Sequence, residues 1–214
     1  TYHLALAQTY HSMMILDRLE GKSPQSSFDN CLAACNQLQT VLPDSIAARR
    51  IRAQAHLVIM GEKMESGQDI ESYGSIALAD LQYIAQRKPQ YPLIAHSQSQ
   101  TCLLLLWARF GHGLPLGNLP ELAEQLARKA AAQQDNPGQA YQILGDLYGL
   151  FSYREFLQGN NPIPWIEKVK EAYLVGLSKV RGRMELYDSL IRNYGSALWV
   201  TEQYGLPTDK WAQE

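Results

Sequence analysis

Two cysteines are the first residues whose type and spacing suit a chemical role. Cys31 and Cys35 lie four positions apart, so on a helix both thiols would share one side and could bind a metal ion. The five histidines add no second pair of ligands, because none belongs to a His-Glu-x-x-His or Cys-x2-Cys arrangement. The two thiols are therefore the one candidate metal site in the sequence.

Motifs for catalysis or cofactor binding are missing from the sequence. It has no Gly-x-Ser-x-Gly nucleophile elbow and no complete phosphate-binding Gly-Lys-Ser/Thr loop. The spacing Gly111-x-Gly113-x3-Gly117 departs from that of dinucleotide-binding loops. We therefore expect no enzyme, no cofactor and no metal. If the chain were an enzyme on a helical scaffold, His96 and Asp146 would be the candidate acid and base.

A recurring glycine indicates how the chain is built. One glycine follows another at intervals of 46 residues, at Gly21, Gly67, Gly113, Gly159 and Gly205. A fixed interval of this length is typical of a chain that stacks one supersecondary unit. Around these glycines we predict a helix, a short turn and a second helix, because a glycine with positive φ can end one helix and Ser-Pro or Asn-Pro can begin the next.

The same period assigns the two cysteines to a core. Moving 46 residues along the chain from Cys31 and Cys35 leads to Ala77 and Leu81, and later to Ala123 and Ala127. Apolar residues recurring at these columns indicate a buried helix face. We therefore favour packed thiols over a metal or redox site.

Two short patterns resemble the tetratricopeptide repeat. Tyr141-x2-Leu144-Gly145-x2-Tyr148 is similar to the first-helix signature of that family, and Ala77-x3-Leu81-x2-Ile84 approximates the second-helix signature. The family repeats every 34 residues, whereas this chain repeats every 46. The chain thus resembles a long-helix variant of the superfamily, of the kind found in bacterial signalling proteins such as serine/threonine kinases. HEAT and armadillo repeats are the competing solenoid families.

The resemblance implies an all-α fold, a right-handed α-solenoid of antiparallel helix hairpins. We expect one domain over residues 1–214, with units at 1–46, 47–92, 93–138 and 139–184 and a partial unit at 185–214.

The candidate binding surface is a stripe along the first helices. If these helices line the concave side, as the resemblance implies, residues 46 apart form columns, and offsets of four and seven residues keep neighbouring columns on one face. Amide and guanidinium groups can hold a peptide backbone or carboxylate, and aromatic side chains anchor interfaces. The predicted binding residues are Arg50, Gln54, His96, Gln100, Trp107, Gln142, Asp146, Tyr153, Arg192 and Trp199.

Other interpretations of these residues stay open. Trp107, Tyr153 and Trp199 could instead fill the space between elongated helices. A deep closed pocket near the same three residues would indicate a domain that senses a small molecule or short peptide. The cluster Arg49-Arg50-x-Arg52 could contact phosphate or an acidic peptide, although we favour solvation with local carboxylate pairing.

Composition limits the classes of partner. The net charge is −2, with 19 basic and 21 acidic residues, so we expect neither nucleic acid nor a membrane surface as partner. An odd count of three cysteines favours a reducing, cytoplasmic compartment. The expected partner is a protein or peptide, or another domain of a longer parent chain. Self-association through an uncovered terminal repeat is a further expectation.

Overall fold

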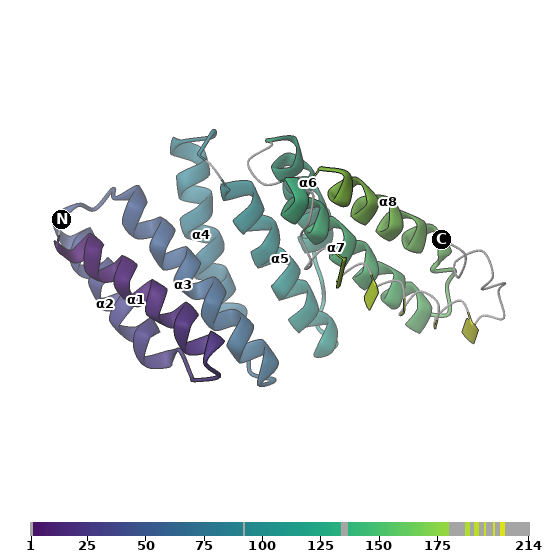
Figure 1. Ribbon diagram of the computed structural model, residues 1–214, viewed down its shortest axis with the longest axis horizontal. Helices are drawn as coiled ribbons and strands as arrows, with labels where there is room; N and C mark the ends of the chain where they lie inside the picture. Colours follow the sequence, from purple (N-terminus) through teal and green to yellow (C-terminus); the bar gives the residue numbers. More distant parts are fainter. Residues whose placement is uncertain are drawn as a thin grey trace. The chain divides into compact units, whose positions relative to one another are not determined.

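The structure is a computed structural model that describes residues 2–91, 93–133 and 137–179, together with isolated helical positions after residue 186. Within this described part the chain forms helices and no strand, which confirms the expected all-α class. The helices are α1 (Tyr2–Leu19), α2 (Gln25–Val41), α3 (Ile46–Glu65), α4 (Glu71–Arg87), α5 (Ile94–Gly111), α6 (Leu119–Ala132), α7 (Pro137–Leu157) and α8 (Ile163–Lys179) (Figure 1).

The recurring glycines end helices as predicted. Their φ angles lie between 65° and 74° at Gly21, Gly67, Gly113 and Gly159. At the first of them, the N–H of Gly21 donates to the carbonyl of Arg18 at 3.0 Å and the N–H of Lys22 donates to the carbonyl of Asp17 at 2.7 Å. This pair of bonds defines a Schellman C-cap. The same pair occurs at Gly67, Gly113 and Gly159. Gly205 lies outside the described residues.

The chain divides into two compact units. The first comprises residues 1–119 with α1 to α5, and the second comprises residues 120–214 with α6 to α8. Each predicted repeat from 1–46 to 139–184 holds one pair of helices, although α3 and α7 begin slightly ahead of the predicted boundaries. A single continuous array over residues 1–214 stays a prediction.

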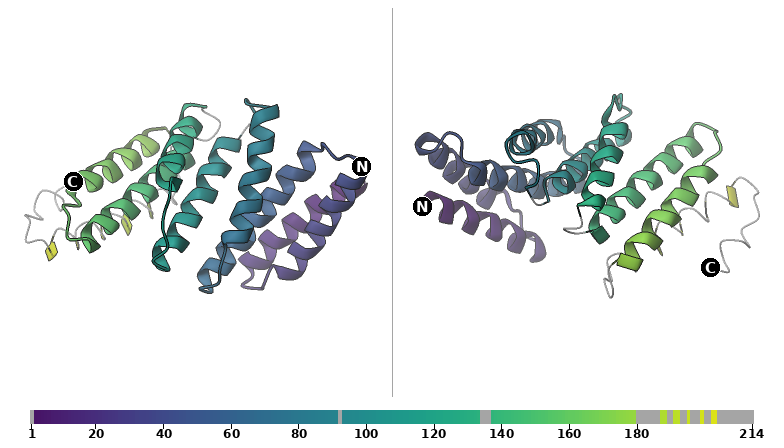
Figure 2. Two further views of the ribbon diagram at one scale, coloured as in Figure 1. Left: turned by 180° about the vertical axis from the view of Figure 1, so that it is seen from behind. Right: turned by 90° about the horizontal axis from the view of Figure 1, so that it is seen from above.

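In the first unit the helices lie on two sides. α1 packs on α2 and α3 packs on α4, while α1 also contacts α3 and α3 contacts α5. No comparable interface joins α2 to α4 among the described residues. Figure 1 shows α1, α3 and α5 running side by side, and Figure 2 shows this unit from two further directions. α1, α3 and α5, each the first helix of its repeat, therefore form one side of the unit.

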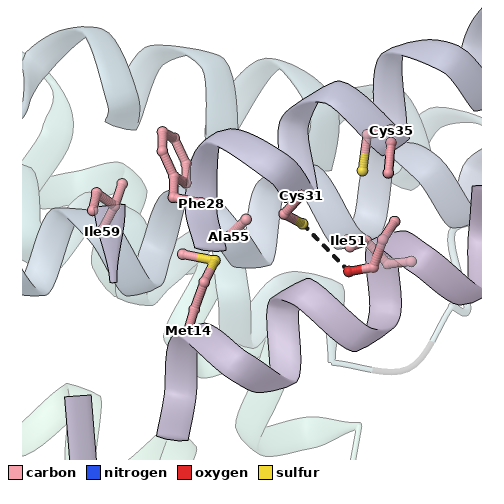
Figure 3. Close-up of a cluster of buried hydrophobic side chains, with 9 residues drawn as sticks. Met14, Phe28, Cys31, Cys35, Ile51, Ala55 and Ile59 are labelled. Carbon is pink, nitrogen blue, oxygen red and sulfur yellow. Dashed lines mark hydrogen bonds between the residues drawn. The ribbon is translucent and has the colours of Figure 1, made fainter. Parts of the chain in front are cut away.

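One buried cluster of this unit lies where α1, α2 and α3 meet, and a second lies among α3, α4 and α5. Met14, Phe28, Cys31, Ala55 and Ile59 are among the buried members of the first cluster (Figure 3). The thiol of Cys31 donates to the carbonyl of Ala7 at 3.4 Å, and Cys35 is equally buried. Both cysteines are packed in the core, which confirms the column argument made from the sequence.

In the second unit, a glycine allows α7 and α8 to approach closely. α7 packs on α8, and a Cβ atom at Gly145 would lie 2.4 Å from the Tyr173 ring. Gly145 is the glycine of the Leu-Gly pair in the predicted first-helix signature. Because the ring occupies the space that a side chain would need, the size of one residue is matched to that of its partner.

Candidate binding surface

The ten predicted binding residues belong to both units. Those of the first unit lie on α3 and α5 and are Arg50, Gln54, His96, Gln100 and Trp107. Those of the second lie on α7, or at described helical positions that follow α8, and are Gln142, Asp146, Tyr153, Arg192 and Trp199. A binding stripe that runs through both units stays a prediction.

The polar columns in the first unit are open to solvent to differing degrees. Gln100 is exposed, as is Gln8 at the matching position of α1, whereas Gln54 on the central helix is half-buried. Arg50 and His96 are also half-buried. Trp107 remains 38% exposed, so it does not simply fill the space between helices.

Arg50 has an unusual environment for an arginine. Its Nη1 lies 3.5 Å from the Oε1 atom of Gln54, at the limit of a hydrogen bond. Its buried Nε has no hydrogen-bond partner among the described residues. Every other arginine between residues 2 and 179 is paired with a carboxylate. A partly buried guanidinium without a counter-charge lowers stability, and a ligand carboxylate would supply that counter-charge.

Two histidines, His11 and His96, lie on α1 and α5, the helices that contact α3 on this side. Burial lowers the pKa of His11, and the positive charge of Arg50 lowers it further. Burial likewise lowers the pKa of His96, and its buried Nδ1 has no partner among the described residues. Both imidazoles therefore favour the neutral form, in which a ring nitrogen can donate one hydrogen bond to a ligand.

The neighbouring arginines have a structural role. Asp80 on α4 is buried and binds Arg49 at 2.9 Å and Arg52 at 2.6 Å. Arg52 also donates to Gln39 on α2 at 2.9 Å. Hydrogen bonding to Asp80 raises the pKa of Arg52. Of the favoured interpretation, solvation with local carboxylate pairing, the structure shows the pairing for Arg49 and Arg52, but with a buried carboxylate. Arg50 has no such pair.

The aromatic column is interrupted on α3. Gly61 stands there, and its α-carbon is covered by the guanidinium of Arg18, with Nη1 2.6 Å from where a Cβ would lie. Arg18 is itself held by Glu65 at 2.5 Å. A side chain reaching over from α1 therefore occupies the place of an aromatic ring.

In the second unit, Asp146 already accepts a hydrogen bond from a neighbouring helix. The hydroxyl of Tyr173 donates to Asp146 Oδ1 at 2.6 Å. Burial raises the pKa of Tyr173, and the nearby Asp146 carboxylate raises it further, while Arg192 lowers it. Asp146 therefore joins α7 to α8 in addition to lying in the predicted polar column.

The aromatic residues of the second unit form an exposed group. Tyr153 is 41% exposed and Trp199 is 49% exposed. Between them lies Phe156, whose ring centroid is 5.3 Å from that of Trp199 and 6.5 Å from that of Tyr153. Sequence reasoning missed Phe156 because it followed columns 46 residues apart. A position three residues after Tyr153, on the same helix face, was the available signal.

A pocket that the sequence did not indicate lies among α6, α7 and α8. Its volume is about 220 Å³. Its lining residues are Arg128, Tyr141, Leu144, Tyr148, Lys168, Glu171, Ala172 and Val175. Burial and the hydrogen bond to Glu124 raise the pKa of Tyr148 to about 12. Tyr153 and Trp199 do not line this pocket, so it is distinct from the one considered for a ligand-sensing domain.

Neither another kind of site nor a known relative assigns a function to the chain. Among the described residues, no group of three or more His, Cys, Asp or Glu side chains is placed to hold a metal ion. Within the same part of the chain, no helix has the length and apolar character needed to cross a bilayer. No protein-family model, curated protein or solved structure matches the chain.

Proposed function

We propose that the chain is a non-catalytic helical-repeat module that binds a peptide or a partner protein, which includes a neighbouring domain of a longer parent chain. In this proposal the helix pairs form a right-handed, tetratricopeptide-like solenoid, and the ligand lies along α1, α3 and α5. The observation that carries the proposal is that the Arg50 guanidinium has no carboxylate partner among the described residues and that its buried Nε donates no hydrogen bond there.

The surroundings of Arg50 favour a ligand with a carboxylate. The three predicted columns contain no acidic residue on α1, α3 and α5, so the chain supplies no counter-charge from these positions. Their members there are Leu4, Arg50 and His96; Gln8, Gln54 and Gln100; and Ile15, Gly61 and Trp107. Gln54, whose side chain lies against the guanidinium, offers a further hydrogen-bond donor, and His96 offers one from the matching position on α5. An acidic side chain or a terminal carboxylate would form charge-assisted hydrogen bonds there, which are stronger than neutral ones.

Trp107 supports the same proposal from α5. It follows His96 by 11 residues, or about three helical turns, and its ring remains partly exposed. Exposed tryptophans of this kind are frequent anchors in interfaces. A ligand that places a carboxylate at Arg50 and an apolar side chain at Trp107 would use both.

A second candidate function is small-ligand binding in the pocket of the second unit. Lys168 lies with its Nζ 4.1 Å from the centroid of the Trp165 ring, and Arg128 donates to the Tyr148 hydroxyl at 2.8 Å. The cationic side chains Arg128 and Lys168 line this pocket together with apolar residues, and such a lining suits a small anion with an apolar part. An enzyme receives less support, because Asp146 already accepts a hydrogen bond from Tyr173.

The test is a selection of peptides from a random library displayed with free C-termini. The full chain serves as bait, and an Arg50→Gln variant of matched thermal stability removes peptides that do not need Arg50. We expect the remaining peptides to be enriched in Asp, Glu or a required free C-terminus, together with an apolar residue. Enrichment of neutral or basic peptides, or an identical set from both baits, would remove Arg50 from the binding surface.

A further inference from the structure

The outer side of α1 is apolar and open. Tyr2 is 73% exposed, Met13 is 43% exposed and Leu16 is 56% exposed. No Asp, Glu, Lys or Arg occurs between Tyr2 and Leu16. Figure 2 shows α1 at the edge of the first unit. A helix at the edge of a globular unit normally carries charged residues on its solvent side, so this helix departs from that rule over four turns.

The repeat register shows what the same face does elsewhere. Residues 46 positions after Ala5, Thr9 and Met13 are Ile51, Ala55 and Ile59 on α3. All three are buried in the core formed with α1 and α2. Figure 3 shows Ala55 among Met14, Phe28 and Cys31. On α3, therefore, this face receives the preceding helix pair.

The first helices of the third and fourth repeats, α5 and α7, bury the corresponding face as well. Its members on α5 include Ile94, Thr101 and Leu105, all buried, and Leu105 lies where a Cβ at Gly74 of α4 would be. On α7 the corresponding buried residues are Ala140, Ile143, Leu147 and Phe151. Among the first helices from α1 to α7 in the described part, α1 is the one that leaves the face uncovered.

We propose that the outer face of α1, defined by Tyr2, Ala5, Thr9 and Met13, is a docking surface for one more helix pair of this chain's own repeat type. The pair would be seated as α1 and α2 are seated on α3. Thr9 occupies the place of Ala55 and Met13 that of Ile59, so these two positions match in size, whereas Tyr2 and Ala5 stand where α3 has Ala48 and Ile51. The absence of charge fits a neutral, apolar helix pair and offers nothing to a charged partner.

The experiment adds such a pair to the full chain. Residues 1–46 are placed a second time ahead of residue 1, which keeps the 46-residue spacing. Since each unit of a repeat protein is stabilised by the interface with its neighbour, a seated pair raises the stability of the whole. We expect one cooperative transition whose Tm is higher by about 5 °C or more, together with slower hydrogen exchange in the original α1.

The matched control carries Thr9→Lys and Met13→Lys in the original α1 only. Both side chains are exposed in the chain as it stands, so without the added pair this variant melts within about 1 °C of the unchanged chain. With the added pair, it loses the gain in Tm. An unchanged Tm or a separate transition for the added pair would overturn the proposal. A dimer of the unextended chain in sedimentation, dissociated by the same two substitutions, would assign the face to a second copy and overturn it as well.

Discussion

His56 shows at the residue scale how burial determines protonation. Its ring lies between Phe28 and Tyr73, with centroid distances of 5.2 Å and 5.9 Å. Burial lowers the pKa of His56 to about 4, with a further contribution from the charge of Arg52. An unfolded chain has a histidine pKa near 6.5, so the unfolded state binds the proton first as the pH falls. Stability is therefore lost as the pH falls from about 6.5 towards 4.

Replacing this histidine removes part of the pH dependence. In a His56→Phe variant the apolar contacts remain and no hydrogen bond of Nδ1 is lost, because that atom has no partner among the described residues. Between pH 7 and pH 4.5, urea unfolding of the unchanged chain should lose about 2 to 3 kcal/mol more than that of the variant. Equal losses in both proteins would show that His56 is not responsible.

Gly145 is a residue whose size is fixed by its partner. A methyl group there would lie 2.4 Å from the Tyr173 ring, so we expect Gly145→Ala to destabilise the protein by about 1 to 3 kcal/mol through overpacking. Gly111→Ala is the control, because a Cβ at Gly111 meets nothing within 4 Å. Thermal unfolding distinguishes the two. A cost at Gly145 no greater than that at Gly111 would contradict the close approach of α7 and α8, and Tyr173→Leu should recover part of the cost.

At the scale of elements, the helix ends depend on backbone conformation rather than packing. Gly67 has a φ of 67°, and a Cβ there would meet nothing within 4 Å. Gly67→Ala should therefore cost about 1 to 2 kcal/mol, and Gly67→Asn should cost less because asparagine tolerates this conformation. Chemical denaturation of the two variants measures the difference. If both substitutions proved neutral, the left-handed cap would not be what ends α3.

The same elements show what a single sequence can predict. The glycine period predicted the four turns, and the columns through Cys31 and Cys35 predicted the core, because both depend on local chemistry repeated at a fixed interval. The burial of Asp80 between Arg49 and Arg52 was not predictable, since it depends on how α3 meets α4. Phe156 was missed because it lies outside the 46-residue columns, and the pocket was missed because it depends on how α6, α7 and α8 pack.

At the scale of the whole molecule, the same helices supply apolar residues to the core and polar residues to the proposed ligand-binding side. α1, α3 and α5 bury apolar columns towards the second helices and carry Gln, His and Arg in the proposed binding columns. A polar group that is half-buried and unpaired lowers stability. Arg50 has no carboxylate partner among the described residues, and its Nε has no hydrogen-bond partner there, which is why we assign it to a ligand rather than to the fold.

The sharpest test of this binding surface is the affinity of a library-selected peptide for three proteins: the unchanged chain, Arg50→Gln and Arg87→Gln. Arg87 lies on α4, has a partly exposed side chain and is paired with Asp44, so it controls for loss of one positive charge. We predict that Arg50→Gln weakens binding about 10- to 100-fold, as expected for loss of a charge-assisted hydrogen bond, while Arg87→Gln leaves it unchanged. Equal affinities for all three proteins would contradict the proposed function.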